Sequence, residues 1–375
     1  MAARKKTIDV RAQRAGLLRS LDRRIRSEGE ISLPAAPALL EIYMRRLASM
    51  FAGMGKRFSR AELTALRSLL EPRLEAGFAQ SPHCRVRVKW QPEPAPATGI
   101  DYRIWLESGT LESEYESWLT SREPPLFGAL PDAKLLHVVG KPAVPARYRI
   151  LDLGAGTGRN SLALARAGHT VDALETTPSF CKQLRKMARA ERLPLEVIEA
   201  NMLAPKLELG RARYSLVLCS EVSPHFRGPA ELRTLFERAA RWLRPGGSLL
   251  LNAFLVVRGF AAAKLVRELS QIAWSSVFTP REVASALEGL PFELMSNESA
   301  HAYEKAHQPP EAWPPTSWFE NWSRGHNCFG VKRGNPPMEL RWLHYRRLEA
   351  KGRSARAHSS TRPRKTTRKT THTAG

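Results

Sequence analysis

The stretch that decides the fold is "ILDLGAGTGRNSLALARAGHTVDALE", which runs from Ile150 to Glu175. An apolar, strand-like run is followed by glycines at every second position, Gly154, Gly156 and Gly158, then by a helical pattern and a second apolar run. A strand, a glycine-rich turn and a helix in this order bring backbone N–H groups to a ligand at the carboxyl edge of a sheet. The stretch therefore predicts a nucleotide-type binding site.

The spacing of the glycines and the acid that follows them indicate which class of nucleotide ligand the site would bind. A dinucleotide fingerprint, G-x-G-x-x-G, would need its third glycine at position 159, where this chain has Arg159. So large a side chain suits the close approach of a pyrophosphate poorly, which disfavours an NAD oxidoreductase. Glu175 ends the second run 21 residues after Gly154, and a carboxylate there can accept hydrogen bonds from both hydroxyls of a ribose. We expect an adenosine ligand with free ribose hydroxyls.

The alternation of strand-like and helical patterns after Arg147 predicts an α/β fold. Apolar, β-branched runs alternate with helical stretches, which favours a Rossmann-like, doubly wound and mostly parallel sheet covered by helices on both faces. Seven strands are expected, over residues 148–154, 170–175, 195–200, 214–220, 248–255, 292–299 and 339–346.

The order of these motifs resembles the class I S-adenosylmethionine-dependent methyltransferases. The resemblance covers about residues 148–300 and is nearest to tellurite-resistance-type and other small-molecule methyltransferases of bacteria. It rests on "LDLGAGTGRNSLALA", "VDALETTP", "EANML", "YSLVLCSEVSPHF", "LRPGGSLLLNAF" and "FTPREVASAL". It implies a methyltransferase with S-adenosyl-L-methionine as cofactor and a small-molecule methyl acceptor.

The resemblance also implies where the cofactor contacts lie. Glu175 would hold the ribose, with Thr176 beside it, while Asn201 and Met202 stand where such enzymes often have an aspartate and an apolar residue for the adenine. Ser220 would lie near the transferable methyl group. The methionine end would be lined by the first turn: Asp152, Gly154, Ala155, Gly156, Thr157, Gly158 and Arg159.

Two side chains in "SEVSPHF" are candidate catalytic residues. Transfer from a sulfonium needs mainly positioning and desolvation, but a hydroxyl or protonated amine acceptor also needs a base. Glu221 and His225 follow the fourth strand on the ligand edge and are the best-placed bases. Structural roles for either residue stay open. The segment before the first strand, with Tyr115, Trp118 and Arg122, is a candidate lid, but for Trp118 the pattern favours a helix that packs its aromatic side chains on the core.

Four segments are expected along the chain. Residues 1–33 form a basic N-terminal segment, and residues 34–140 a mainly helical region that includes a short strand at "CRVRVKW" and a possible substrate or cofactor lid. Residues 141–350 form the methyltransferase domain, and 351–375 a disordered basic tail. Within the domain, residues 304–339 hold six prolines, too many for a helix, and three tryptophans, too many for a disordered linker. This insertion either caps a pocket or packs outside the sheet.

Composition and charge bear on the possible partners, the location and the metal binding of the protein. The formal net charge of +23 is concentrated at the two ends, since residues 1–26 carry +7 and residues 351–375 carry +8. These ends can contact nucleic acid non-specifically or simply aid solubility. No apolar run is long enough for a membrane span, and the basic N-terminal stretch lacks the apolar run of a secretory signal, so a cytoplasmic protein is expected. The four cysteines lack metal-ligand spacing and are expected as reduced thiols without a metal site.

Two alternatives of other classes remain. A nucleic-acid methyltransferase would use the basic ends for phosphate contact, but "SEVSPHF" replaces the Asn-Pro-Pro-aromatic or Asp-Pro-Pro-Tyr motif that base-methylating members often carry. A non-catalytic S-adenosylmethionine-binding protein is the other alternative. The sequence does not indicate the acceptor or the oligomeric state.

Overall fold

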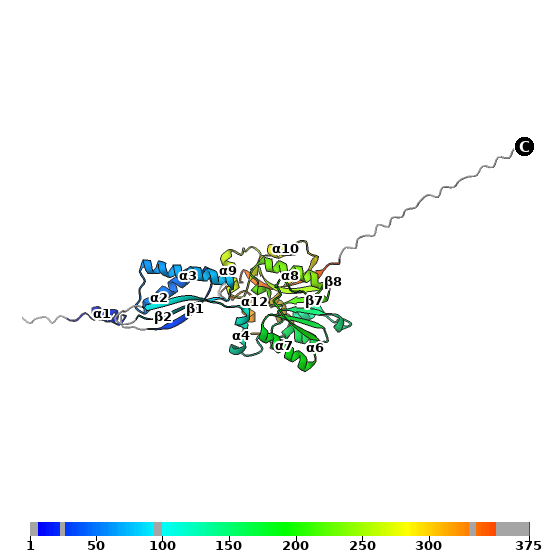
Figure 1. Ribbon diagram of the computed structural model, residues 1–375, viewed down its shortest axis with the longest axis horizontal. Coiled ribbons are helices and arrows are strands. Elements are labelled where there is room, and N and C mark those ends of the chain that lie inside the picture. The colour runs from blue at the N-terminus through cyan, green and yellow to red at the C-terminus, as the bar shows by residue number, and fades with distance from the viewer. Residues whose placement is uncertain (1–6, 23–26, 94–99, 330–334, 350–374) are drawn as a thin grey trace, which may run out of the picture.

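The computed structural model describes residues 7–22, 27–93, 100–329, 335–349 and 375. The expected basic tail lies outside the described residues except for Gly375. The described part of the N-terminal segment holds helix α1 (Val10–Asp22) and the start of strand β1 (Gly29–Pro34). Figure 1 shows a small N-terminal unit, drawn in blue and cyan, next to a larger domain.

The larger domain is built on the expected sheet. Its strands lie in the order β10-β11-β8-β7-β4-β5-β6, and β11 alone runs antiparallel to its neighbours among these pairs. The mostly parallel, doubly wound fold is confirmed. An eighth strand, β9, pairs with β8 and was not predicted, because it is only two residues long. The strands are β4 (Ile150–Leu153), β5 (Val171–Glu175), β6 (Leu195–Glu199), β7 (Tyr214–Cys219), β8 (Leu243–Val256), β9 (Val277–Phe278), β10 (Phe292–Ser299) and β11 (Met338–Arg347).

Helices cover both faces of this sheet, as its apolar strands require. Leu232 and Phe236 of α8 and Val283 of α10 pack with one face, whereas Leu135 of α5 and Leu164 of α6 pack with the other. The helices of this domain are α5 (Ala133–Val139), α6 (Arg159–Arg166), α7 (Pro178–Glu191), α8 (Pro229–Trp242), α9 (Lys264–Ile272), α10 (Pro280–Leu287), α11 (Ala300–His307) and α12 (Phe319–Ser323).

The N-terminal unit contains more strand than the sequence predicted. Strands β1, β2 (Arg85–Pro92) and β3 (Ile100–Glu107) form an antiparallel sheet, over which α2 (Leu40–Gly53) and α3 (Arg60–Gln80) bury a core of their own. Only β2 was expected. β3 does alternate, with Ile100 and Ile104 turned into the core, but it follows directly on the proline-rich stretch "QPEPAPATG", whose composition is typical of a linker or a turn.

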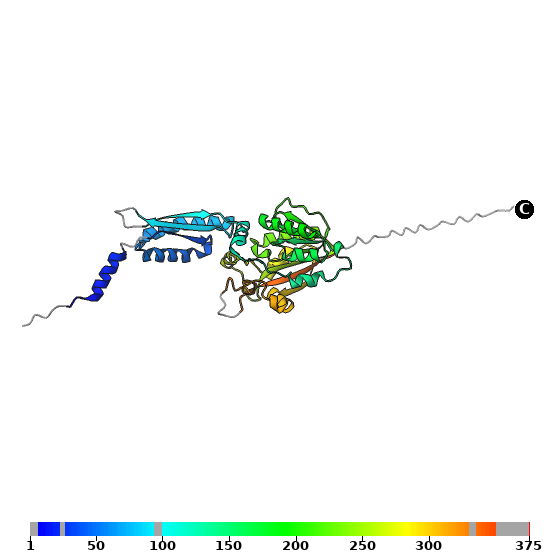
Figure 2. The ribbon, with the colours of Figure 1, turned by 90° about the horizontal axis from the view of Figure 1, so that it is seen from below.

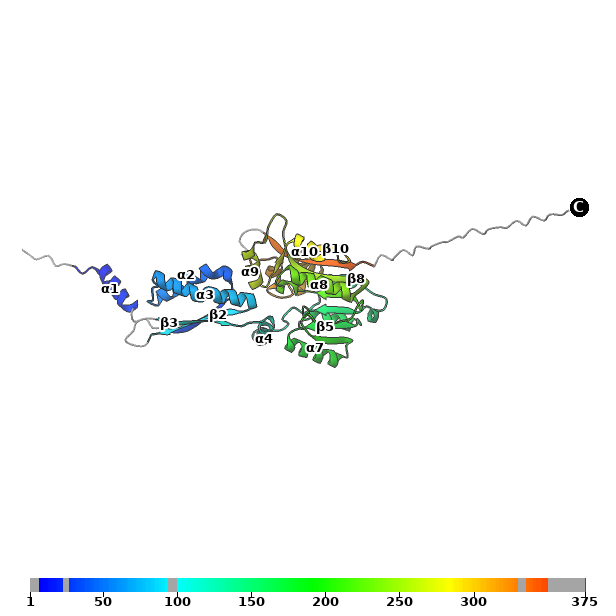
Figure 3. The same ribbon diagram turned by 45° about the horizontal axis from the view of Figure 1, so that its top comes forward.

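Contacts at the end of α3 join the unit to the larger domain, and the two lie side by side in Figures 2 and 3. The Arg227 guanidinium donates to the Phe78 carbonyl at 2.6 Å and lies over the Phe78 ring. The His83 ring meets Trp274 edge-on, with ring centroids 5.0 Å apart. The helix α4 (Leu111–Ser121) then leads from β3 into the larger domain.

The proline- and tryptophan-rich insertion both packs and lines a cleft. Its first four residues belong to α11, and Phe319 and Trp322 of α12 are buried against the sheet. Pro315 and Trp318, with Trp322, also face the large cleft described below. The two interpretations left open by the sequence therefore both hold for the described part of the insertion.

Candidate functional site

The glycine turn after β4 needs glycine at each of its three positions, for different reasons. Gly154, Gly156 and Gly158 have φ values of 71°, 57° and 94°, a region that other residues rarely adopt. A Cβ on Gly154 would also lie 2.3 Å from Val222, and one on Gly158 would lie 2.4 Å from Leu184. Only Gly156 has a Cβ direction free of a severe clash. Gly154 and Gly158 thus allow close packing as well as a positive φ, whereas Gly156 mainly allows the positive φ, with the Phe127 ring 3.3 Å from where a Cβ would lie.

Glu175, at the end of β5, ties this turn to the neighbouring strand. Its Oε2 accepts a hydrogen bond from the Gly156 N–H at 2.8 Å, and its Oε1 accepts from the N–H groups of Thr176 and Thr177 at 2.9 and 2.8 Å. The residue is 4% exposed. Three backbone donors therefore hold the carboxylate at the carboxyl edge of the sheet, where the sequence predicted it.

A single large cleft, of about 1310 Å³, collects most of the predicted site residues. This exceeds the roughly 300–1,000 Å³ of an ordinary small-molecule site, so a cofactor and a second ligand have room together. Thr157 and Gly158 lie in the same turn but outside the lining, and Gly158 packs near Leu162 and Leu184. The predicted residues that do line the cleft are Asp152, Gly154, Ala155, Gly156, Arg159, Glu175, Thr176, Asn201, Met202, Ser220, Glu221 and His225.

At the expected adenine end of the cleft, the side chain of Asn201 already has a hydrogen-bond partner within the protein. Met202 is buried at the wall, but the Asn201 side chain already accepts a hydrogen bond through Oδ1 from the Leu203 N–H at 2.8 Å. A carbonyl oxygen has two lone pairs, so one remains for a ligand. Asn201 therefore shapes the loop after β6 as well as facing the cleft.

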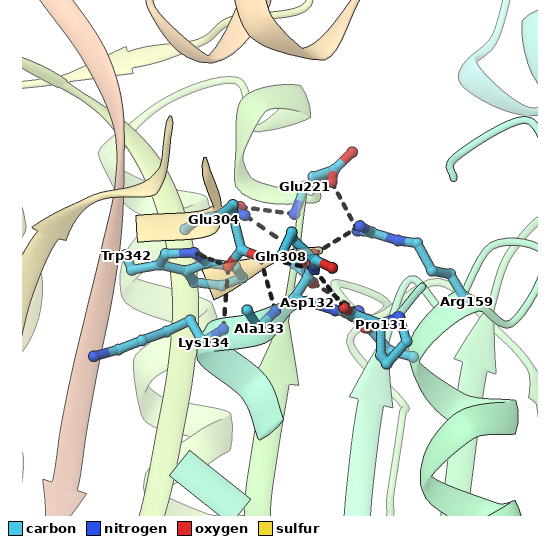
Figure 4. Close-up of polar contacts among 12 residues, drawn as sticks. Pro131, Asp132, Ala133, Lys134, Arg159, Glu221, Glu304, Gln308 and Trp342 are labelled. Carbon is cyan, nitrogen blue, oxygen red and sulfur yellow. Dashed lines mark hydrogen bonds and ion pairs between the residues drawn. The ribbon is translucent and has the colours of Figure 1, made fainter. Parts of the chain in front are cut away.

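Arg159 is buried and paired with two carboxylates. Its Nη1 lies 2.7 Å from Asp132 Oδ1 and its Nη2 lies 2.8 Å from Glu221 Oε1 (Figure 4). Nearby, Asp152 accepts a hydrogen bond from the Ser161 hydroxyl at 2.6 Å, and burial raises the pKa of Asp152 to about 6. The side chain that replaces a third glycine is thus part of an ion network at the edge of the sheet.

Glu221, the first of the two candidate bases, has a strained backbone and a shifted pKa. Its φ is 60°, and its N–H donates to Asn252 Oδ1 at 2.7 Å. Burial raises the pKa of Glu221 to about 7, and the Arg159 guanidinium opposes that rise. Strain of this kind at a cleft is typical of functional sites. A carboxyl group that titrates near neutral pH is matched to proton transfer.

His225, the second candidate, is held in its neutral form. Its Nε2 lies 3.0 Å from the Tyr115 hydroxyl, and burial lowers the pKa of His225 to about 3. Tyr115 comes from α4, so the candidate lid contacts a candidate base. Burial also raises the pKa of the Tyr115 phenol, next to the carboxylates of Glu175 and Glu221.

Helix α4 closes one side of the cleft, and its three candidate residues all line it. The Trp118 ring stacks on Trp274 with centroids 5.0 Å apart and planes 9° apart, while the Arg122 guanidinium lies 3.4 Å from the Trp118 centroid. Two carboxylates of α4 bind hydroxyls near the end of β5 and the start of α7. Glu112 accepts a hydrogen bond from the Thr176 hydroxyl at 2.9 Å, and Glu116 accepts one from the Ser179 hydroxyl at 2.6 Å.

Sequence reasoning missed Asp132 and Trp274. Asp132 precedes the helical run "AKLLHVV", which signals a helix start but says nothing of a partner in α6. Trp274 lies in a loop with φ at 57°, and no local pattern predicts its stack on Trp118. Among the described residues, no cluster of His, Cys, Asp and Glu has the geometry of a metal site. Within that same part of the chain, no helix is long and apolar enough to cross a membrane.

Comparison with known proteins bears on the same part of the chain. Residues 150–247, from β4 to the start of β8, match the family model "Methyltransferase domain". The match supports a class I S-adenosylmethionine-dependent methyltransferase domain over these residues.

Two curated relatives and one solved structure are also similar to parts of this chain. The methyltransferase domain resembles a ubiquinone biosynthesis O-methyltransferase of Xanthomonas campestris pv. campestris (strain B100), with 29% identity over 33% of this chain and 50% of the relative. The chain thus spans about half the length of that relative. A demethylmenaquinone methyltransferase of Clavibacter sepedonicus is 28% identical over 56% of this chain and 77% of its own. A solved geranyl diphosphate C-methyltransferase from Streptomyces coelicolor A3(2) superposes with a TM-score of 0.45 and 15% identity, over 64% of this chain and 85% of its own.

Proposed function

We propose that this protein transfers a methyl group from S-adenosylmethionine to a small-molecule acceptor. The observation that carries the proposal is one cleft that joins the glycine turn and Glu175 to a carboxyl group of raised pKa, Glu221. The cofactor fits the residues present. Gly156 lines the cleft, Glu175 can accept hydrogen bonds from ribose hydroxyls, and the cleft has room for an acceptor beside the cofactor.

The roles of the lining residues follow from their positions. We assign the methionine end to Asp152, Gly154, Ala155 and Gly156, with Ser220 near the methyl group, and the ribose to Glu175 with Thr176. Asn201 and Met202 would contact the adenine. When bound, S-adenosylmethionine supplies a methyl group on a positively charged sulfur, already activated for transfer. The chain then has to orient the acceptor, exclude water and remove a proton.

Glu221 is the proposed base. Its Oε1 is bound by Arg159, and Oε2 has no hydrogen-bond partner among the described residues, so Oε2 is the atom that would take the acceptor's proton. Neutral His225, held by Tyr115, would orient the acceptor rather than bear a charge. The aromatic side chains of Tyr115, Trp118 and Trp274 would exclude water from the site.

The charges in the cleft favour an acceptor without phosphates. Of the cations that line the cleft, Arg159 is paired with two carboxylates, Arg227 is bound to Phe78 and Gln271, and Arg122 lies over Trp118. Several carboxylates share the lining, so a polyanion would meet repulsion there. This supports a small molecule over nucleic acid. The names of the relatives, which refer to ubiquinone biosynthesis and demethylmenaquinone, support the same class.

The test is transfer of a radiolabelled methyl group from S-adenosylmethionine to a panel of neutral phenols and quinols, with nucleotides and RNA as anionic comparisons. We expect label in a neutral acceptor. Glu221→Ala should lower turnover far more than cofactor affinity, and equal losses in both would remove Glu221 from the role of base. Glu237→Gln, an exposed change on α8, serves as the matched control and should change neither. Transfer to RNA alone would contradict the small-molecule proposal.

A further inference from the structure

Three ionisable side chains from distant parts of the chain form a buried line at the carboxyl edge of the sheet. Asp132 precedes α5, Arg159 begins α6, and Glu221 follows β7. Their side chains are 3%, 8% and 15% exposed, and the two contacts that join them measure 2.7 and 2.8 Å. Exposed ion pairs contribute little, but buried ones fix geometry when every partner is satisfied.

Asp132 stands where a helix-capping residue is expected, yet its carboxylate does not cap α5. The backbone N–H groups of Ala133 and Lys134 instead donate to Glu304 at 2.7 and 3.1 Å. Glu304 is itself held by the Trp342 indole N–H at 3.0 Å (Figure 4). Because a carboxylate from α11 satisfies the start of α5, the Asp132 carboxylate is left for other partners.

Those partners all belong to the cleft. Asp132 Oδ1 contacts Arg159, and Asp132 Oδ2 accepts hydrogen bonds from Asn160 at 2.8 Å and from the Ser220 hydroxyl at 2.7 Å. Ser220 immediately precedes Glu221. Asp132 therefore holds both the guanidinium that binds Glu221 Oε1 and the side chain of the residue before Glu221, while Glu221 Oε2 has no hydrogen-bond partner among the described residues.

We propose that Asp132 and Arg159 are positioning residues for Glu221: together they fix the place and orientation of its carboxylate in the cleft. The inference rests on the proposed function insofar as Glu221 acts as the base. Asp132 reaches the reaction only through Arg159 and Ser220.

The charges that face Glu221 predict that substitutions of Arg159 and Asp132 shift the pKa of Glu221 in opposite directions. Arg159 favours the ionised form of Glu221, whereas Asp132 and Glu304 disfavour it, and the neutral Tyr115 phenol lies in the same wall. Removing Arg159 should therefore raise the pKa of Glu221, and removing the charge of Asp132 should lower it. A residue that served only to stabilise the fold would not produce shifts of opposite sign.

The experiment is a carbon-13 NMR titration of glutamate side-chain carboxyls in the full-length protein, with the Glu221 signal identified by its loss in Glu221→Gln. We expect Arg159→Gln to raise the pKa of Glu221 by about 1 unit or more and Asp132→Asn to lower it. Arg149→Gln is the matched control, because Arg149 pairs with buried Asp172 at the opposite end of β4, and it should leave the titration unchanged. Shifts of the same sign, or none, would overturn the proposal.

A conservative variant, Arg159→Lys, and a measurement of cofactor binding test the positioning role independently of the titration. If Arg159→Gln does not fold, Arg159→Lys retains the charge but loses the two-carboxylate geometry; it should keep the pKa of Glu221 near its native value while methyl transfer falls by about 100-fold. Unchanged methyl transfer in Arg159→Lys would contradict a positioning role. Calorimetric binding of S-adenosylmethionine to the same variants distinguishes a failure of the positioning role from a failure of the proposed function. Normal binding with an unshifted titration defeats only this inference, whereas the predicted shifts without cofactor binding defeat the proposed function.

Discussion

The glycines after β4 have separable roles, which substitution by alanine would reveal. At Gly158 the backbone φ is 94°, and an added Cβ would lie 2.4 Å from Leu184 and 2.8 Å from Leu162. Left-handed strain costs about 1–2 kcal/mol and overpacking about 1–3 kcal/mol, so Gly158→Ala should lower the free energy of unfolding by about 2–5 kcal/mol. At Gly156 the nearest atom to the added Cβ is a Phe127 ring carbon at 3.3 Å, so the strain of about 1–2 kcal/mol dominates.

The assay combines thermal unfolding with calorimetric binding of S-adenosylmethionine. Gly158→Ala should lower Tm by about 4–20 °C, but the fraction that stays folded should bind the cofactor nearly as well as the unmodified protein. Gly156→Ala should lower Tm by only about 2–8 °C and weaken binding, because Gly156 lines the cleft and Gly158 does not. Equal destabilisation by the two substitutions, or a binding defect confined to Gly158→Ala, would refute this division of roles.

Four further outcomes are expected. Glu175→Gln should weaken cofactor binding by about 10–100-fold in calorimetry, since hydrogen bonds to a charged group become neutral ones; unchanged affinity would remove Glu175 from the ribose site. Turnover should rise with pH through about 7, because only ionised Glu221 accepts a proton, and a pH profile that is identical in Glu221→Gln would contradict this. Tyr115→Phe loses the 3.0 Å contact with His225 and should lower the free energy of unfolding by about 1 kcal/mol in denaturant titrations. Deleting residues 351–375 should reduce the affinity for RNA and its dependence on salt while leaving cofactor binding intact, and a loss of both would link the tail to the site.

The parts of the site that lie at the carboxyl ends of predicted strands could be predicted. The glycine turn follows β4, Glu175 ends β5 and Glu221 lies just after β7, and parallel strands bring their carboxyl ends to one edge of the sheet. Local spacing therefore sufficed for these residues. It did not separate packing from binding within the turn, because the neighbours of Gly158 come from α6 and α7.

The supporting contacts could not be predicted, because they join segments far apart in the chain. Asp132 reads as a helix cap, and only the fold shows that Glu304 takes over the capping and leaves Asp132 to Arg159. Likewise β1 is six residues long and needs the neighbouring β2 to be recognised as a strand. The stack of Trp274 on Trp118 depends on how α4 lies against the loop after α9.

The central claim is that the cleft holds S-adenosylmethionine rather than a dinucleotide, and calorimetric titration of the full-length protein with each ligand tests it most directly. We predict saturable binding of S-adenosylmethionine at one site per chain and no binding of NAD under the same conditions, with a circular dichroism spectrum to establish that the sample is folded. Binding of NAD, or no binding of S-adenosylmethionine by a folded sample, would contradict the assignment.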